Sequence, residues 1–365
     1  MPYHPQPDRQ ARRLEAVPPS TGQREMTEKL TISIAMATYN GESFLREQLD
    51  SFLWQTRLPD ELVVCDDGSN DRTLDILDRF ARQAPFPVKT YCNPKNLGSS
   101  KNFEKAINLC SGDLIYLSDQ DDVWLPDKLR EMEQAFLKYP NASYAFSDAF
   151  VVDEKLKILR HSLGGYYHLS FDDVTHFPPG DFFLQLISLR HMVIHGCTIV
   201  LNAQFRDYLL PIPDYWAHDE WISIMGSLAF EVIAVPSKLI NYRQHSKQQY
   251  GVITPMKRLK QFFIINRNDY LVQSFRWQNA LAQANLKGIY LNAEIKHHIL
   301  NRLEHYRIRG TLSNNIIKNL PFVISELRDG RYTKYSNGWK SALKDIVAID
   351  IKLLRSAGII NKSPS

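Results

Sequence analysis

Short apolar segments alternate with longer amphipathic segments over the first third of the chain. The apolar segments have the length of buried strands and cover residues 32–37, 62–65, 88–91 and 114–117. Between them, apolar residues recur with a helical period over residues 41–55, 71–82 and 99–109. Strands and helices that alternate over short connections form a mostly parallel sheet flanked by helices. The pattern therefore predicts an α/β fold that binds its ligands at the carboxyl ends of the strands.

The pattern loosens after residue 143. Further strands are expected at 145–152, 197–201 and 232–235, and a helix at 214–229. The aromatic, proline-containing segment 160–190 is typical of a loop or lid.

Three regions follow from these patterns. Residues 1–29 are rich in Pro, Gln and Arg and lack apolar periodicity, which predicts a disordered extension. Residues 30–250 are expected to form the α/β domain. Residues 251–365 are expected to be mainly helical, with apolar stripes beside Lys and Arg.

Charge is distributed unevenly between these regions. The net formal charge is +4, but residues 251–365 hold 19 Lys and Arg against seven Asp and Glu, so the remainder is acidic. A basic helical region suggests an anionic membrane surface as a partner. A helical cap over the domain or a dimer interface would explain the same helices. No nucleic-acid-binding motif is present, so nucleic acid is not expected as a partner.

The cysteines and the hydropathy pattern indicate the cellular compartment of the protein. The four cysteines show no paired spacing, which favours free thiols in a reducing compartment. The sequence has neither an 18-residue apolar run nor the apolar core of a signal peptide. We therefore expect a cytoplasmic protein that could lie peripherally at the inner face of the cell membrane.

An acidic cluster follows the fourth predicted strand. Asp119, Asp121 and Asp122 lie within residues 118–126. Carboxylates gathered at a strand end repel one another, and a divalent cation removes that cost. Mg²⁺ or Mn²⁺ held by carboxylates commonly also holds substrate phosphates. The alternative is a solvated acidic turn in which Asp122 caps the helix that follows.

Two other strand ends carry residues suited to a nucleotide. Tyr39 follows the first strand, where its ring could stack on a base. Asp67 follows the second strand, where a carboxylate can accept a hydrogen bond from the ring N–H of uracil or thymine. Capping of the next helix by Ser69, Asn70 or Asp71 explains part of that stretch equally well.

Residues 96–102 open the third predicted helix. Free N–H groups at a helix start favour phosphate, and Lys101 would add positive charge. An ordinary serine-capped helix start is the alternative. Neither a P-loop nor a dinucleotide-binding fingerprint occurs, so a nucleotide would be held in another way.

Taken in order, these stretches resemble the family 2 glycosyltransferases, an inverting family with the nucleotide-sugar-binding GT-A fold. The resemblance extends over about residues 30–245 and is carried by 37–41, 66–69, 96–98 and 118–124. The form of residues 118–129 is most similar to bacterial rhamnosyltransferases that build surface polysaccharides such as O-antigen. The resemblance implies a GT-A catalytic domain.

The resemblance implies roles on the donor side. Asp119 and Asp121 match the D-x-D signature, whose second carboxylate binds the metal while the first lies near the ribose or the metal's waters. Asp67 matches the acid that binds the base, and Ala37 and Tyr39 belong to the turn beside it. Lys101 stands near a position where a basic residue approaches the donor.

Inversion at an anomeric carbon requires a general base on the acceptor hydroxyl, opposite the leaving diphosphate. The resemblance assigns this role to Asp219, at the start of the helix predicted at 214–229. Glu220 is the second candidate, and helix capping is the alternative. Trp221 is a candidate for stacking on a sugar, although core packing explains a lone tryptophan equally well.

Two further segments complete the match. Gly196 lies in the family's acceptor-side turn, where the missing Cβ would let a sugar approach the backbone. Arg243 and His245 lie in a Tyr-Arg-x-His stretch, where Arg243 would contact the diphosphate and His245 would complete the metal shell. A lone histidine is more often a surface or core residue.

The sequence thus predicts an inverting glycosyltransferase that depends on Mn²⁺ or Mg²⁺. The expected donor is dTDP-L-rhamnose, with a UDP-hexose or UDP-N-acetylhexosamine as the alternative, and the expected acceptor is a lipid-linked or oligosaccharide glycan. A sugar-phosphate nucleotidyltransferase would carry a Gly-rich basic loop where this chain has residues 37–40. An inactive sugar-nucleotide or glycan-binding protein is the non-enzymatic alternative.

Overall fold

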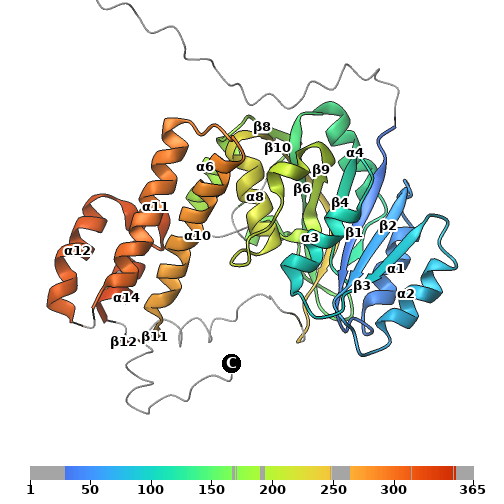
Figure 1. Ribbon diagram of the computed structural model, residues 1–365, viewed down its shortest axis with the longest axis horizontal. Coiled ribbons are helices and arrows are strands. Elements are labelled where there is room, and N and C mark those ends of the chain that lie inside the picture. The colour runs from blue at the N-terminus through green and yellow to red at the C-terminus, as the bar shows by residue number, and fades with distance from the viewer. Residues whose placement is uncertain are drawn as a thin grey trace, which may run out of the picture.

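The computed structural model describes residues 29–166, 169, 171–189, 194–246, 248, 264–313, 315–347 and 349–350. Over these residues a ten-stranded sheet lies between layers of helices, and a separate group of helices extends from one side (Figure 1). The predicted disordered extension lies, apart from Lys29, outside the described residues. The predicted boundary at residues 250 and 251 also lies outside them.

The first half of the sheet is parallel, as predicted. Strand β1 (Ile32–Thr38) pairs with β2 (Glu61–Asp66) and β4 (Leu114–Ser118), and β2 pairs with β3 (Val88–Cys92). The connections contain the predicted helices, α1 (Leu45–Leu53), α2 (Thr73–Ala81) and α3 (Ser99–Leu109). Helices cover both faces of this sheet, so β1, β2 and β4 are continuous apolar runs.

The second half of the sheet is mixed. Strand β9 (Ile199–Asn202) runs antiparallel between β4 and β6 (Ala142–Val152). Strand β10 (Glu231–Arg243) is parallel to β6 and antiparallel to the two-residue β5 (Val123–Trp124). The complete order is β3-β2-β1-β4-β9-β6-β10-β5. The short strand β5 therefore holds the acidic segment 119–122 between the end of β4 and the end of β10.

Helix α6 (Asp181–Leu189) corrects the expectation of a loop or lid over residues 160–190. Its residues Phe182, Phe183, Leu186 and Ile187 are buried in the main apolar core. These positions recur at helical spacing, and that period outweighs the nearby prolines. Around α6, the segment also contains α5 (Leu163–Tyr166) and β8 (Thr175–Phe177), and β7 (Ile158–Arg160) precedes it.

The sheet separates two apolar cores. Ala35 of β1 faces the core formed with α3, α6 and α8 (His218–Ala229), whereas Ile34 and Met36 face the core formed with α1, α2 and α4 (Lys128–Lys138). The short elements η1 (Gly196–Thr198), η2 (Ala203–Phe205) and α7 (Arg206–Leu209) connect the first core to the sheet.

The C-terminal region is mainly helical, as predicted. It contains α10 (Arg267–Leu286), α11 (Ala293–Thr311), α12 (Ile316–Arg328), α13 (Arg331–Tyr335) and α14 (Trp339–Val347), and strands β11 (Ile264–Ile265) and β12 (Ile349–Asp350) pair with each other. Trp277 of α10 is buried against Trp216, with ring centroids 5.9 Å apart. The helical region therefore shares a core with the α/β domain.

None of the helices within the described residues is both long enough and apolar enough to cross a membrane.

Candidate active site

Carboxylates gather where β4 ends. One ligand atom each from Asp119, Asp122 and Cys197 lies within 4.8 Å of the other two. Burial raises the pKa of Asp119 well above its usual value, and the charges of Asp121, Asp122 and Asp219 raise it further. Among the described residues, no hydrogen-bond donor lowers this pKa. Burial and mutual repulsion thus disfavour the charged forms of these carboxylates, which is a setting suited to a cation.

The Cys197 thiol is a poor member of such a site. It is fully buried, and burial raises its pKa well above the usual value, as do the charges of Asp122 and Asp119. A sulfur ligand is also soft, whereas Mg²⁺ and Mn²⁺ prefer oxygen ligands. The available hard ligands are therefore the carboxylates.

Asp122 is buried and ties the acidic segment to β10. Its Oδ1 accepts a hydrogen bond of 3.0 Å from the backbone N–H of Arg243. Burial raises its pKa to about 7, with Asp121 adding to the shift. The helix that follows begins at Lys128 with Asp127 at its N-cap, so the alternative of Asp122 as a cap is wrong.

Arg243 is fully buried and directs its guanidinium at the protein. Its Nε donates to the Asp121 carbonyl at 2.8 Å, its Nη1 donates to the Glu154 carbonyl at 2.6 Å, and its Nη2 pairs with Glu47. A side chain with no exposed surface does not contact a diphosphate, so the structure corrects that expectation. Arg243 instead positions the acidic segment.

The two predicted metal ligands lie together. His245 Nε2 is 2.8 Å from Asp121 Oδ2, and the imidazole packs against Phe44 with ring centroids 4.6 Å apart. The end of β10 thus carries His245 to the D-x-D segment. Their shared role as metal ligands stays a prediction.

Asp219 reaches the same site from α8. It accepts a hydrogen bond from the backbone N–H of Gly196, and the thiol of the next residue, Cys197, lies within 4.8 Å of a carboxylate oxygen of Asp119. The charge of Asp219 accordingly contributes to the raised pKa of Asp119. Burial raises the pKa of Asp219 itself, whereas His195 and the backbone N–H groups of Glu220 and Gly196 oppose that shift. The N-cap of α8 is Ala217, so capping does not account for Asp219.

Glu220 is engaged elsewhere. It forms an ion pair with Arg276 of α10, and the Arg276 guanidinium lies 4.0 Å from the ring centroid of Trp216. Burial raises the pKa of Glu220, and Arg276 lowers it. This ion pair links the helical region to the start of α8 and makes Glu220 the weaker candidate for a base.

Trp221 belongs to the core. Its side chain has no exposed surface, and its Nε1 donates to the Leu209 carbonyl at 2.8 Å. The expectation that it stacks on a sugar is therefore wrong, and core packing, which the sequence left open, accounts for it.

Gly196 packs directly under α8. A Cβ at this position would overlap the imidazole of His218, which stacks on Phe103 at 4.0 Å between ring centroids. Burial lowers the pKa of His218 to about 3, so the ring is neutral. Close packing thus requires a glycine here, and the approach of a sugar to this turn stays a prediction.

Asp67 organises the turn before α3. Its carboxylate accepts hydrogen bonds from Asn93 Nδ2 at 2.8 Å and from the backbone N–H groups of Leu97 at 2.7 Å and Gly98 at 2.8 Å. Gly98 has a φ of 80°, which favours glycine. Asp67 therefore fixes a turn at the carboxyl edge of the sheet, and its contact with a base stays a prediction.

Gln120 lies between the two D-x-D carboxylates, and the sequence alone did not indicate a role for it. Its Oε1 accepts from the Tyr39 N–H at 2.9 Å, and its Nε2 donates to the Tyr39 carbonyl at 3.0 Å. A Cβ on Gly41 would overlap this amide. The Tyr39 ring is half exposed, and Ala37 pairs with Cys65 between β1 and β2. The predicted nucleotide turn and the acidic segment are thus joined directly.

Lys101 points from α3 toward the segment that precedes α8. Its Nζ donates to the Ile212 carbonyl at 2.5 Å and to Glu104 at 3.0 Å, and it lies 3.6 Å from Asp214. These contacts stabilise the segment of chain that precedes α8, the helix that carries Asp219. A contact of Lys101 with the donor stays a prediction.

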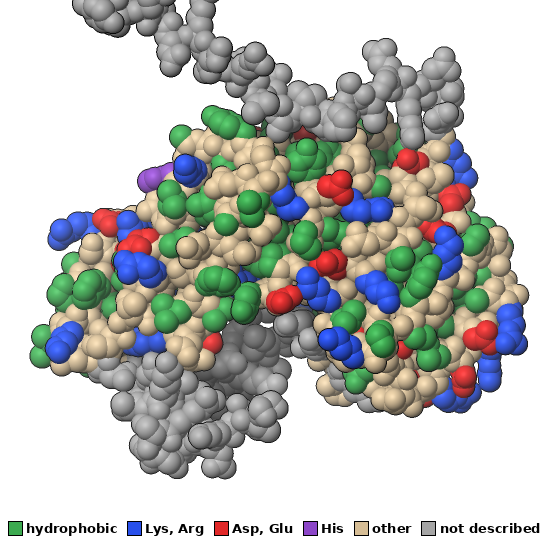
Figure 2. All heavy atoms as spheres, viewed as in Figure 1, with side chains coloured by type: hydrophobic (Ala, Val, Ile, Leu, Met, Phe, Trp, Pro, Cys, Tyr) green, Lys and Arg blue, Asp and Glu red, His purple; other side chains and the backbone are tan. Residues whose placement is uncertain are grey.

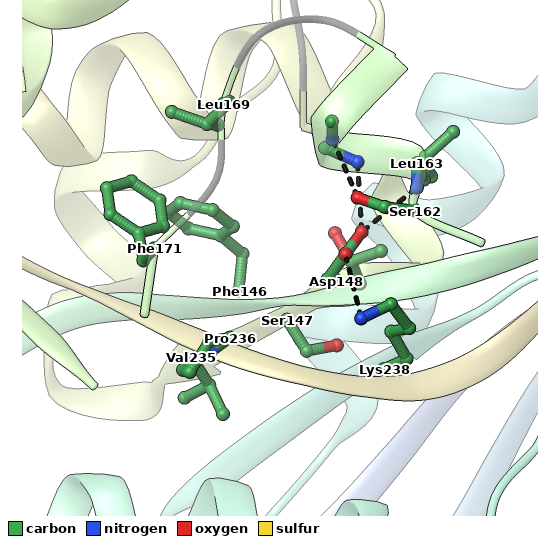
Figure 3. A pocket seen from close by; sticks show the side chains of 13 residues that line it. Phe146, Ser147, Asp148, Ser162, Leu163, Leu169, Phe171, Val235, Pro236 and Lys238 are labelled. Carbon is green, nitrogen blue, oxygen red and sulfur yellow. Dashed lines mark hydrogen bonds and ion pairs between the residues drawn. The ribbon is translucent and has the colours of Figure 1, made fainter. Parts of the chain in front are cut away.

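A pocket of about 300 Å³ lies between β6, β10 and residues 162–165, 169 and 171. Figure 3 shows Phe146, Leu169 and Phe171 on one side of it and Asp148, Ser162 and Lys238 on the other. Thr198 also lines it, two residues from Gly196, and two residues of chain span at most about 7 Å. The pocket is therefore close to the turn that contacts Asp219.

The polar groups of the pocket are only partly satisfied. Asp148 Oδ1 accepts from the backbone N–H groups of Leu163 at 3.0 Å and Gly164 at 2.9 Å, while Lys238 Nζ is 4.0 Å from Asp148 Oδ2. The buried Ser147 Oγ has no hydrogen-bond partner among the described residues. Such a pocket offers an apolar aromatic side and a polar side to a ligand.

Comparisons with known proteins agree with this geometry. The sequence profile described as "Glycosyl transferase family 2" matches residues 33–201. The dTDP-rhamnosyl transferase RfbG of Shigella flexneri is 24% identical over 306 residues, which cover 80% of this chain and 99% of that protein. An uncharacterized glycosyltransferase of Methanocaldococcus jannaschii is 24% identical over 69% of this chain and 81% of its own length.

Solved structures show the same fold. S. aureus TarS 1-349 in complex with UDP has a TM-score of 0.54 and 14% identity, over 91% of this chain and 93% of that one. The complex of TarS 1-349 with UDP-GlcNAc gives a TM-score of 0.52.

Proposed function

Residues 33–201 are a glycosyl transferase family 2 domain, and on this premise we propose that the protein is an inverting, metal-dependent transferase that moves L-rhamnose from dTDP-L-rhamnose onto a glycan. The observation that carries the proposal is that Asp119, Asp121 and Asp219, from two separate parts of the chain, gather at the end of β4, where Cys197 lies within 4.8 Å of Asp119 and the adjoining Gly196 N–H bonds Asp219. The similarity to a dTDP-rhamnosyl transferase supports the choice of donor.

The residues present fit a hard divalent cation. Asp119 and Asp121 supply carboxylate oxygens, and the imidazole of His245 lies at Asp121. In this proposal Asp121 and His245 hold Mn²⁺ or Mg²⁺, and Asp119 lies beside the ribose or the waters of the metal. When bound, the ion would act as a Lewis acid on the leaving diphosphate.

Asp219 acts as the general base in the proposed reaction. It takes the proton of an acceptor hydroxyl as that oxygen bonds to the anomeric carbon and the bond to the diphosphate breaks on the opposite face. Its raised pKa, caused by burial, makes it a stronger base than an exposed aspartate. Glu220 does not share the role because Arg276 neutralises it.

The base of the donor is proposed to lie at the ends of β1 and β2. Tyr39 offers a half-exposed ring there, and Asp67 fixes the adjoining turn. Gln120 holds this turn at the acidic segment, which suits a ligand that spans both.

The acceptor is proposed to enter the pocket beside Thr198. Aromatic faces pack against the apolar faces of sugar rings, and Lys238 offers a polar contact to their hydroxyl groups. We propose a lipid-linked or oligosaccharide glycan as the acceptor, and action in the cytoplasm at the inner face of the membrane.

A second candidate donor is a UDP-N-acetylhexosamine or UDP-hexose. The support for it is that TarS, a structural neighbour, has been solved with UDP-GlcNAc. The same catalytic residues would serve either donor.

The test measures metal-dependent thermal stabilisation and hydrolysis of dTDP-L-rhamnose, UDP-glucose and UDP-GlcNAc. We expect stabilisation by one donor only with Mn²⁺ or Mg²⁺. Asp219→Asn should keep that stabilisation and lose turnover, while the control Glu220→Gln should keep measurable turnover. Absence of stabilisation by every donor, with and without metal, would contradict the proposal.

A further inference from the structure

Helix α12 buries polar side chains and exposes apolar ones, which is the reverse of an ordinary surface helix. The side chains that face inward are Asn319, Val323 and Glu326, each at most 2% exposed. In contrast, Ile317 is 80% exposed and Ile324 is 48% exposed. An amphipathic helix normally buries its apolar stripe, so this arrangement requires an explanation.

The inward polar groups are fully engaged, which shows that the orientation of α12 is specified. Glu326 accepts from Arg331 at 2.5 Å and lies 2.6 Å from His305 Nδ1. Asn319 Nδ2 donates to the Ser313 carbonyl at 2.6 Å, and its Oδ1 accepts from the Ser313 N–H at 2.9 Å. Rotating the helix to bury its apolar stripe would break these buried interactions, which is costly.

Five of the six large apolar side chains that α12 exposes form one continuous stripe. At 100° per residue, five exposed side chains lie within about 100° of the helix circumference: Ile316, Ile317, Leu320, Ile324 and Leu327. The neighbouring α14 adds a second stripe at i, i+4 and i+8, with Trp339, Leu343 and Val347 exposed. Figure 2 shows hydrophobic and basic side chains together at this end of the molecule.

The exposed charge beside these stripes is mostly positive. Between residues 315 and 347 the described side chains that are both charged and exposed are Lys318, Arg328, Lys334 and Lys340, against the single acid Asp329. The other acids of this segment are buried in ion pairs, Glu326 with Arg331 and Asp345 with Arg309. Pairing two copies through this face would bring like charges together, whereas an anionic surface complements them.

We propose that the exposed face of α12 and α14 is a membrane-docking surface for anionic bilayers. The apolar stripes lie in the interface between headgroups and acyl chains, and the surrounding Lys and Arg contact the anionic headgroups. The surface is part of the helical region and separate from the transfer site. This inference rests on the membrane location given in the proposed function, but it does not depend on the donor or the acceptor.

The test is co-sedimentation of the full chain with vesicles of 70% phosphatidylcholine and 30% phosphatidylglycerol. We expect binding that weakens at high salt and is weaker to vesicles of phosphatidylcholine alone. The double variant Ile317→Glu with Ile324→Glu should bind at least about tenfold more weakly. Ile317→Glu alone should also weaken binding, whereas its matched control Phe322→Glu, which adds the same single charge on another side of the helix, should bind like the wild type.

Two measurements separate the outcomes. The double variant should keep the thermal transition of the wild type because both residues are exposed. Light scattering should give the same mass for both proteins. Failure of the wild-type chain to bind these vesicles would overturn the proposal, and so would a variant that converts a dimer to a monomer, because a second copy would then cover this face. Donor stabilisation, measured separately, would be unaffected in either case.

Discussion

Arg243 shows how one buried side chain can set the geometry of a site without contacting a ligand. Its backbone N–H bonds Asp122 and its guanidinium bonds the Asp121 carbonyl, so β10 fixes two consecutive residues of the acidic segment. The planar guanidinium suits this set of acceptors, and a lysine ammonium cannot reproduce it.

Replacing Arg243 by Lys should therefore lower the free energy of unfolding by about 2–4 kcal/mol, because it leaves buried acceptors unpaired. Metal-dependent donor stabilisation should fall with it. Chemical denaturation and thermal shift measure the two effects. Arg46→Lys is the control, since Arg46 pairs with Asp50 on the surface and should change stability by less than about 1 kcal/mol. Equal effects of both changes would contradict the role given to Arg243.

Gly196 gives a second prediction at the residue scale. Gly196→Ala should destabilise the protein by about 1–3 kcal/mol, because its Cβ overlaps His218. Turnover should fall too, because Asp219 directly follows His218 in α8 and would be displaced with it. Denaturation and donor hydrolysis check this. Adding His218→Ser should restore part of the turnover by making room, and no rescue would indicate that the glycine has another role.

At the scale of elements, the helices and strands were predictable where the apolar residues follow a single period. The parallel strands and α1 to α3 follow from apolar runs and helical spacing. Strand β5 was missed because Val123 and Trp124 are too few to show a period, and β10 was ended eight residues early because Pro236 interrupts its apolar run. Tertiary pairing with β6 extends this strand past the proline.

The site was predictable to the same degree. The resemblance to family 2 glycosyltransferases indicated Asp119, Asp121 and Asp219, which lie near one another in the structure, while their roles stay predictions. It could not show that Trp221 and Arg243 face inward, because burial depends on contacts with distant residues such as Leu209 and Glu47. One feature of the sequence hinted at the role of Gln120, namely the glycine at position 41. Only the structure shows that this glycine makes room for the Gln120 amide.

Helix α8 should make the protein sensitive to acid. Burial lowers the pKa of His218 to about 3, so below pH 6.5 the unfolded chain binds a proton that the folded chain excludes. Stability is then present above pH 6.5 and falls by about 1.4 kcal/mol per pH unit as the pH drops toward 3. Urea denaturation at pH 7 and pH 5 measures this, and His218→Asn should reduce the loss. An unchanged loss in that variant would exclude His218 as its source.

At the scale of the whole molecule, the helical region and the α/β domain fold around one core. Trp277 of α10 packs on Trp216 and Phe183, and Arg276 pairs with Glu220 beside the proposed base. The two regions should therefore unfold in one cooperative transition.

Trp277→Ala should lower the free energy of unfolding by about 3–5 kcal/mol and broaden or split the transition, because it removes the largest shared side chain. Trp339→Ala is the control, since Trp339 is 66% exposed and the change should stay within about 0.5 kcal/mol. Calorimetry distinguishes the outcomes. A small effect of Trp277→Ala would mean that the two regions are stable independently.

Strand β10 lines the pocket with Lys238 and holds the acidic segment with Arg243. Arg243 follows Lys238 by five positions, which is a span of at most about 17 Å along a strand. Adding or removing one residue there would turn every following side chain to the opposite face of the sheet. This segment therefore sets the distance between the pocket and the acidic segment, whereas surface loops can change length more freely. Swapping the pocket for that of a relative should succeed only when the segment is transferred at the same length.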